Sequence, residues 1–219
     1  MVLLSASICG LRKLMAKCEI VCDYVGSHGH NYNAKKSVVM VFEAGGKVPS
    51  SVPPVMLNGT ALQRVSQFKY LGHILTSDLK DNADIERERR ALSVRANMLA
   101  CKFTRCSESV KGTLFRAYCM NFYTCNLWAK YSQKSYNAIR VQYNNAFRVL
   151  MGLPRFCSAS GMFAEAHMDC FYSTMRKRCG ALVRRVRGST NSILKLIASR
   201  LDCTYVGHCC AISNGMAQR

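Results

Sequence analysis

Acidic residues are scarce in this chain of 219 residues. It contains 12 Asp and Glu against 31 Lys and Arg, which gives a formal net charge of +19. With so few carboxylates to neutralise them, the cations repel one another unless a polyanion covers them, and the simplest polyanion is a nucleic acid. We therefore expect RNA or DNA as the partner.

Long apolar runs are also missing. No stretch of about 18 apolar residues occurs, so we expect no membrane span and no membrane partner. Arg12 and Lys13 follow the apolar segment Met1–Ile8, which is not the order of a secretory signal. We therefore expect an intracellular protein, cytoplasmic or nuclear, whose 13 cysteines are reduced and mostly fill apolar helix faces.

Motifs for nucleophilic catalysis or metal binding are not found either. None of the five histidines lies in a nucleophile motif, and the segment with His28 and His30 offers no Cys or carboxylate at ligand spacing, which favours a flexible loop. The best zinc-like cluster is Cys203 with His208-Cys209-Cys210. Adjacent cysteines rarely share one tetrahedral ion, and no second pair accompanies them. We expect no metal in these residues.

The first part of the chain mixes one helix with short strands. Residues 8–25 place apolar side chains at helical spacing behind Ser5 or Ser7, either of which suits a helix N-cap. The run Val38–Phe42 is typical of a buried strand, and it follows Lys36. These patterns predict a small α+β region.

Two further strand signals follow. Residues 55–62 read as a hairpin, because Asn58-Gly59 suits a type I′ turn, which needs positive φ twice. Phe68–Leu75 alternates bulky and polar groups around Gly72, which predicts a strand with a tight bend. If this strand belongs to the core, Phe68, Tyr70 and Leu71 are ordinary core residues; if it faces a ligand, they are exposed.

From residue 84 onward apolar residues recur three to four positions apart, which predicts helices. In the second of these helices the predicted apolar stripe is Val110, Leu114, Tyr118, Phe122 and Cys125. The tail 201–219 is weakly patterned, so we expect it to be disordered. The helices are expected over residues 84–103, 107–128, 136–150, 158–167 and 171–187.

The helix over residues 171–187 has a basic face. At about 100° per residue, Arg176, Lys177, Arg184 and Arg187 lie away from the apolar side. No acid occurs between Asp169 and Asp202, so the face has no i,i+4 carboxylate partners. A solvated basic face fits this pattern, and a phosphate-facing surface fits it at least as well.

Several segments, in their order and spacing, resemble the reverse transcriptases of non-LTR retrotransposons (LINE, jockey-like elements). Phe68-Lys69-Tyr70-Leu71-Gly72 is similar to their primer grip, the strand that closes the palm before the helical thumb. The other similar segments are Met1–Ser7, Asn33-x-x-Lys36-Ser37 with its following strand, Asp84-Ile85 with Arg87, Arg89 and Arg90, and Phe147–Pro154.

The resemblance implies an α+β fold. Residues 1–77 would form a partial polymerase palm of one helix and four to five mostly antiparallel strands, and residues 78–200 a helical thumb and connection region. The implied partner is an RNA or DNA template–primer, together with the missing polymerase portion. The residues expected to contact nucleic acid are Phe68, Lys69, Tyr70, Leu71, Gly72, Arg87, Arg90, Arg95, Arg176, Lys177, Arg184 and Arg187.

Polymerase chemistry requires clustered carboxylates that hold two Mg²⁺ ions. The family takes them from strands that precede the similar segments, and no adjacent Asp-Asp occurs in this sequence. We therefore expect no cofactor in this fragment and no polymerase activity from it alone, with Lys36 at most an auxiliary group beside a complete palm. The alternative is a non-catalytic basic helical module that binds nucleic acid or protein.

Overall fold

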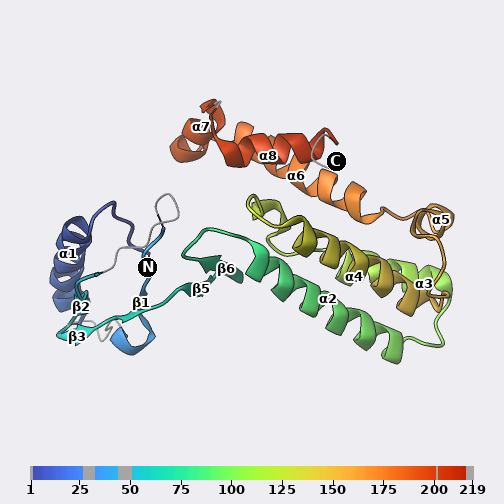
Figure 1. Ribbon diagram of the computed structural model, residues 1–219, viewed down its shortest axis with the longest axis horizontal. Coiled ribbons are helices and arrows are strands. Elements are labelled where there is room, and N and C mark those ends of the chain that lie inside the picture. Colours follow the sequence, from blue (N-terminus) through green and yellow to red (C-terminus); the bar gives the residue numbers. More distant parts are fainter. Residues whose placement is uncertain (1, 27–32, 44–50, 201, 216–219) are drawn as a thin grey trace. The chain divides into compact units, whose positions relative to one another are not determined.

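The structure, a computed structural model, describes residues 2–26, 33–43, 51–200 and 202–215, with the backbone alone for residues 19–26. It is an α+β structure of two compact units (Figure 1). The first unit comprises Met1–Lys69 and Leu75–Leu79, and the second, mostly helical unit comprises Tyr70–Ile74 and Lys80–Arg219. The predicted loop with His28 and His30 lies outside the described residues.

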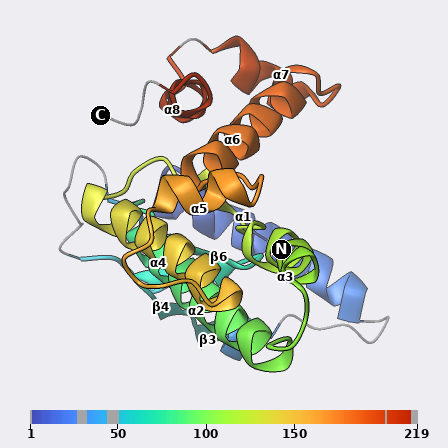
Figure 2. The same ribbon diagram turned by 90° about the vertical axis from the view of Figure 1, so that its right-hand side faces the viewer.

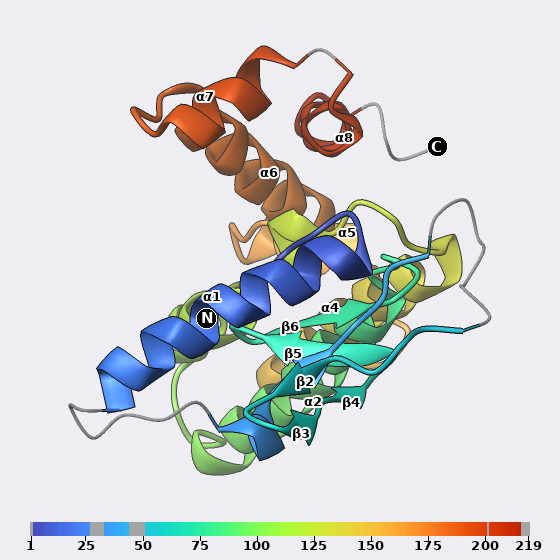
Figure 3. The ribbon, with the colours of Figure 1, turned by 90° about the vertical axis from the view of Figure 1, so that its left-hand side faces the viewer.

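Helix α1 (Ile8–Gly26) organises the first unit. The hydroxyl of Ser7 accepts the N–H of Gly10 at 3.0 Å, so the predicted serine cap is confirmed. Met15 is buried with Val55 and Leu57, which brings α1 alongside strand β2 (Met56–Leu57) (Figure 3). This small apolar cluster is the core of the unit.

The first hairpin also follows the prediction. Strand β2 pairs antiparallel with β3 (Thr60–Ala61), with Met56 opposite Ala61. The turn residues Asn58 and Gly59 have φ of 49° and 74°, the two positive values that a type I′ turn needs.

The arrangement of the strands differs from the predicted partial palm of four to five mostly antiparallel strands. The described residues hold six strands of two to four residues in three separate two-stranded sheets. Strand β1 is only Val38–Val39, follows the short 3₁₀ helix η1 (Ala34–Lys36), and pairs in parallel with β4 (Gln63–Arg64). The predicted buried strand Val38–Phe42 is therefore wrong beyond Val39. Strand β1 pairs with Gln63 and Arg64, which are exposed and polar. This pairing therefore offers no apolar layer that would bury a longer strand.

The helical unit is built around α2 (Asn82–Lys102) and α4 (Gln133–Met151), which run side by side (Figure 2). Their facing residues, among them Leu92 and Tyr143, are almost completely buried. Ser132 caps the start of α4, and Gly152 ends it with φ of 68°. The remaining long helix is α6 (Phe171–Arg187), and the short helix α5 (Ala159–Glu165) precedes it.

The predicted helix over 107–128 ends early, in a π-helical turn. Helix α3 (Glu108–Leu114) continues into η2 (Phe115–Cys119), where the N–H of Met120 donates to the carbonyl of Phe115, five residues earlier. A short 3₁₀ helix, η3 (Cys125–Leu127), follows separately, so the prediction is wrong beyond Cys119. The buried side is also shifted by one residue from the predicted stripe, because Phe115 and Cys119 are buried whereas Tyr118 is 50 % exposed.

The end of the chain is more ordered than predicted. Helix α7 (Ser192–Ser199) begins behind the cap Asn191, and α8 (Thr204–Ser213) packs against α6. Cys209 and Ile212 of α8 are buried in the core of the helical unit, so the expectation of a disordered tail is wrong for residues 204–213. Among the described helices, none has the length and apolar character needed to span a membrane.

Candidate functional site

The segment predicted as a bent strand is a hairpin. Strands β5 (Gln67–Tyr70) and β6 (His73–Thr76) pair on either side of Leu71 and Gly72, whose φ values are 46° and 84°. A left-handed conformation costs a residue with a side chain about 1–2 kcal/mol, so Leu71 is held there by its surroundings. The tip of this hairpin, residues 70–74, belongs to the helical unit.

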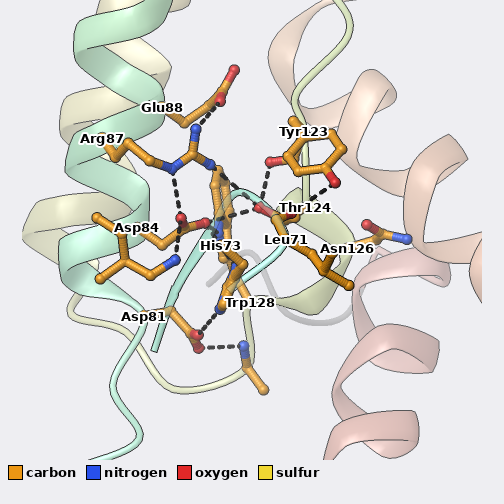
Figure 4. Close-up of polar contacts among 12 residues, drawn as sticks. Leu71, His73, Asp81, Asp84, Arg87, Glu88, Tyr123, Thr124, Asn126 and Trp128 are labelled. Atoms are coloured by element: carbon orange, nitrogen blue, oxygen red, sulfur yellow. Dashed lines mark hydrogen bonds and ion pairs between the residues drawn. The ribbon is translucent and has the colours of Figure 1, made fainter. Parts of the chain in front are cut away.

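Tyr123 holds the tip of the hairpin (Figure 4). Its hydroxyl donates to the carbonyl oxygen of Leu71 at 2.8 Å. Its ring lies so close to Gly72 that a Cβ there would be 2.6 Å from the ring atom Cε1. Glycine is therefore required at position 72 by its backbone conformation and by its neighbour together.

Asp84, in the first turn of α2, connects the hairpin to the helices. Its side chain is completely buried, and its two oxygens accept from four groups. These are the N–H of Ile74 at 3.0 Å, Nε of Arg87 at 2.7 Å, the hydroxyl of Thr124 at 3.0 Å and the indole N–H of Trp128 at 2.8 Å. A buried carboxylate with this many donors keeps its charge.

His73 lies between two carboxylates. Its Nδ1 is 3.0 Å from Asp84 and its Nε2 is 3.7 Å from Asp81. The Nδ1 contact lacks hydrogen-bond alignment, so it is a close ion pair. Asp81 also accepts the N–H groups of Ala129 and Lys130, each at 2.8 Å, and thereby fixes the segment after Trp128.

Glu88 extends the same network along α2. It is 1 % exposed and receives Nη1 of Arg87 at 3.1 Å and Nη2 of Arg95 at 2.6 Å. With His73 protonated, three cations face the three carboxylates Asp81, Asp84 and Glu88. The network is therefore neutral as a whole, which is the condition for burying it.

The pKa values follow from these contacts. The pairing of His73 with the carboxylates of Asp81 and Asp84 outweighs burial and raises the pKa of His73 to about 9. Burial acts to raise the pKa of Asp84, but the ion pair with His73 and the hydrogen bonds from Arg87, Trp128 and Ile74 hold that pKa well below its usual range. Both groups are thus charged at neutral pH.

The network is suited to holding the hairpin, since its three carboxylates already have partners within the protein. Among the described residues, no group of three or more His, Cys, Asp and Glu is placed to hold a metal ion. What remains accessible to a ligand is the surface of the turn.

The residues of the predicted grip are exposed. Phe68 is 38 %, Tyr70 42 % and Leu71 73 % exposed, and Lys69 is exposed as well. The alternative that these side chains form ordinary core is therefore wrong. Gly72 is half-buried beneath Tyr123.

The arginines predicted on α2 are already paired. Arg87 and Arg95 are bound to Asp84 and Glu88, with side chains 20 % and 26 % exposed. Arg90 is exposed, yet its Nε lies 2.8 Å from Glu86. Hydrogen bonds from Arg89 and Arg90 lower the pKa of Glu86 to about 2 against the opposing effect of burial, so that carboxylate stays charged.

The basic residues of α6 are placed differently. Arg176, Lys177, Arg184 and Arg187 are all exposed. Lys177 lies 2.5 Å from Asp169, whereas no carboxylate within the described parts of the chain pairs with the other three. Helix α6 thus has the cationic surface that the sequence predicted.

The other candidates are not members of this network. Lys36 is exposed at the end of η1, in the first unit. In α8, Cys209 is buried, His208 contacts the hydroxyl of Tyr131 at 3.2 Å, and Cys210 accepts from Arg187. The cysteine side chains that the structure describes are free thiols.

Sequence reasoning missed the roles of Tyr123, Trp128 and His73. Tyr123 and Trp128 act through partners far along the chain, 52 and 44 positions earlier. His73 acts through the nearer residues Asp81 and Asp84, which it meets only because the hairpin folds onto the start of α2. One feature of the sequence could have indicated the site. Asp84 and Glu88 lie on the apolar side of α2, and buried carboxylates there need cations or N–H donors as partners.

Replacement of Gly72 by alanine tests the packing of the turn. We expect a loss of about 2–3 kcal/mol in the free energy of unfolding, because the new Cβ combines left-handed strain with a clash against Tyr123. Gly152→Ala is the matched control, since Gly152 also has positive φ but no atom within 4 Å of its added Cβ. It should lose about 1 kcal/mol in urea unfolding. Equal losses in the two variants contradict the clash.

Comparisons with known proteins add no relative: no family model, no curated protein and no solved structure matches the chain. Function is therefore inferred from the residues and their geometry.

Proposed function

We propose that this chain binds template–primer nucleic acid as part of a retrotransposon-type reverse transcriptase. In this proposal the tip of the β5–β6 hairpin acts as the primer grip and the helical unit as the thumb. The 219 residues hold a strand but do not extend it alone, because their sequence offers no adjacent pair of acids for two Mg²⁺ ions.

The unneutralised cationic face of α6 carries the proposal. Arg176, Arg184 and Arg187 lie within an arc of about 80° at 100° per residue. They extend over roughly 16 Å of helix, a length along which one strand of a duplex carries about five phosphates. The opposite side, with Phe171, Met175 and Cys179, is buried. A basic surface without nearby carboxylates has its most favourable partner in a polyanion.

The arginines of α2 do not form a comparable unneutralised surface. They are matched by Asp84, Glu86 and Glu88, so a phosphate there would have to displace a carboxylate. We therefore assign the main phosphate contacts to α6 and leave Arg87 and Arg95 as structural residues.

The hairpin supports the same proposal. Its turn exposes Tyr70 and Leu71 while its backbone is fixed to Tyr123 and Asp84. A fixed, exposed turn that follows the exposed Lys69 in sequence offers a surface for a nucleic-acid backbone. The resemblance of this segment to primer grips points in the same direction.

Binding to RNA and to a primer–template duplex should be measured as a function of salt. Each phosphate contact contributes about 0.7–0.9 to the slope of log K against log salt. Arg184→Ala/Arg187→Ala should therefore flatten the slope by about 1.4–1.8 and weaken binding of every sequence alike. The control Arg89→Ala/Arg90→Ala removes the same charge from residues already paired with Glu86, and should leave the slope nearly unchanged.

Two results count against the proposal. Absence of binding by the wild-type chain, or binding with a flat salt dependence, rejects nucleic acid as the partner. Equal losses in the two double variants reject the assignment to α6. The polymerase origin is tested separately by the DNA upstream of the Met1 codon, where a continuous frame ending in aromatic-x-Asp-Asp is expected.

A further inference from the structure

Tyr123 is both fixed and exposed. Its hydroxyl is bound to the Leu71 carbonyl at 2.8 Å and its ring edge lies against Gly72, yet the residue is 58 % exposed. A free surface tyrosine loses rotamer freedom when a ligand packs on it. In Tyr123 that freedom is already lost in the folded protein, so its ring is a preordered flat surface (Figure 4).

The turn that Tyr123 holds carries exposed apolar side chains. Tyr70 is 42 % and Leu71 73 % exposed in the turn that Tyr123 holds. Exposed apolar side chains gathered at one place indicate a binding surface more than the same residues scattered singly.

One cation lies close to the same segment. Arg178 of α6 donates to the side chain of Asn121, two residues before Tyr123. Nη2 of Arg87 lies 3.4 Å from the hydroxyl of Thr124, the residue after Tyr123, but the charge of Arg87 is matched by Asp84 and Glu88. An exposed aromatic ring in a segment that is bound by Arg178 suits a ligand that is flat and aromatic on one part and anionic on another.

We propose that Tyr123 stacks on an unpaired nucleobase, which makes this patch a site for single-stranded RNA or DNA. The inference rests on the proposed function. It adds that the patch at the turn binds single-stranded nucleic acid in preference to a duplex. Every base has a π-face, so the site tolerates any sequence. A duplex presents such faces only at its ends and therefore gains little from Tyr123.

The test uses the full chain with a labelled single strand of about 12 nucleotides and its duplex, at one salt concentration. Tyr123→Leu keeps bulk against Gly72 but removes the π-face, so we expect single-strand affinity to fall about 5- to 100-fold. Duplex affinity should change much less, because its main phosphate contacts are assigned to α6. Tyr123→Phe keeps the ring and loses only the hydroxyl, so it should bind the single strand within about threefold of wild type.

Retained duplex affinity also shows that Tyr123→Leu is folded. Wild-type single-strand affinity in Tyr123→Leu overturns the stacking site. An equal loss for single strand and duplex overturns it too, because the residue then acts through the fold. If the wild-type chain binds neither probe, the proposed function itself fails, which distinguishes the two failures.

Discussion

Replacing Asp84 with asparagine is expected to lower the free energy of unfolding of the helical unit by about 3–5 kcal/mol. The substitution keeps the shape of the side chain but removes a charge that is completely buried and that faces both Arg87 and His73. Those cations then lack their shared counter-ion inside the protein. The amide also offers two donors where the wild-type oxygens accept from Trp128 and Thr124.

Trp128 is a convenient probe for this experiment. It is the only tryptophan of the chain, is 1 % exposed, and donates to Asp84, so its fluorescence reports the site directly. Urea unfolding should be followed at this signal and compared with that of Glu86→Gln. Glu86 lies on the same helix and also binds two arginines, but its side chain is 38 % exposed. The control should lose at most about 1 kcal/mol. Similar losses in both variants contradict a buried network.

The stability of the helical unit should fall as pH rises from 6.5 to 8.5. The pKa of His73 is raised to about 9 by Asp81 and Asp84, whereas an unfolded histidine has a pKa near 6.5. A raised folded-state pKa gives stability that is complete below the unfolded value and is lost as pH rises toward the folded value. Across this window of two pH units, His73 should account for a loss of about 2–3 kcal/mol.

The window lies outside the range in which the thiols with a raised pKa, and His208, change the stability. Burial raises the pKa of the Cys119 and Cys125 thiols to about 11 and about 12, so they reduce stability only above about pH 8.5. Burial lowers the pKa of His208, whose effect therefore falls below pH 6.5. His73→Gln is the control: its unfolding free energy, followed at Trp128, should be nearly flat over the window. A wild-type curve as flat as that of the variant contradicts the assigned pairing.

Local patterns predicted the regular elements well. Helix α6 begins and ends at the predicted residues, α4 ends at Gly152, and the turn at Asn58 and Gly59 has the expected dihedrals. In each case the information lies within a few residues of sequence. Helix periodicity and the conformational freedom of glycine are sufficient there.

Features set by distant contacts were not predicted. The buried side of α3 and η2 is shifted by one residue from the predicted apolar stripe, and nothing in the local spacing of Val110 to Phe122 indicates this shift. The site also depends on a contact between distant residues. The sequence identified Gly72 as the glycine of the turn, but it did not indicate that Tyr123 covers this glycine. The arginines of α2 are different, because Asp84 and Glu86 lie three and four residues before Arg87 and Arg90, a spacing at which helix residues pair and which the sequence already contained.

The turn of the hairpin is anchored through three of its own groups. The Leu71 carbonyl is bound to Tyr123, while the His73 ring and the Ile74 amide are bound to Asp84. No slack chain separates these anchors from α2, so a mechanical load on the turn passes directly into the first turn of that helix. A force applied at Leu71 is therefore transmitted to Tyr123 and to Asp84 of α2, and the turn moves together with these residues.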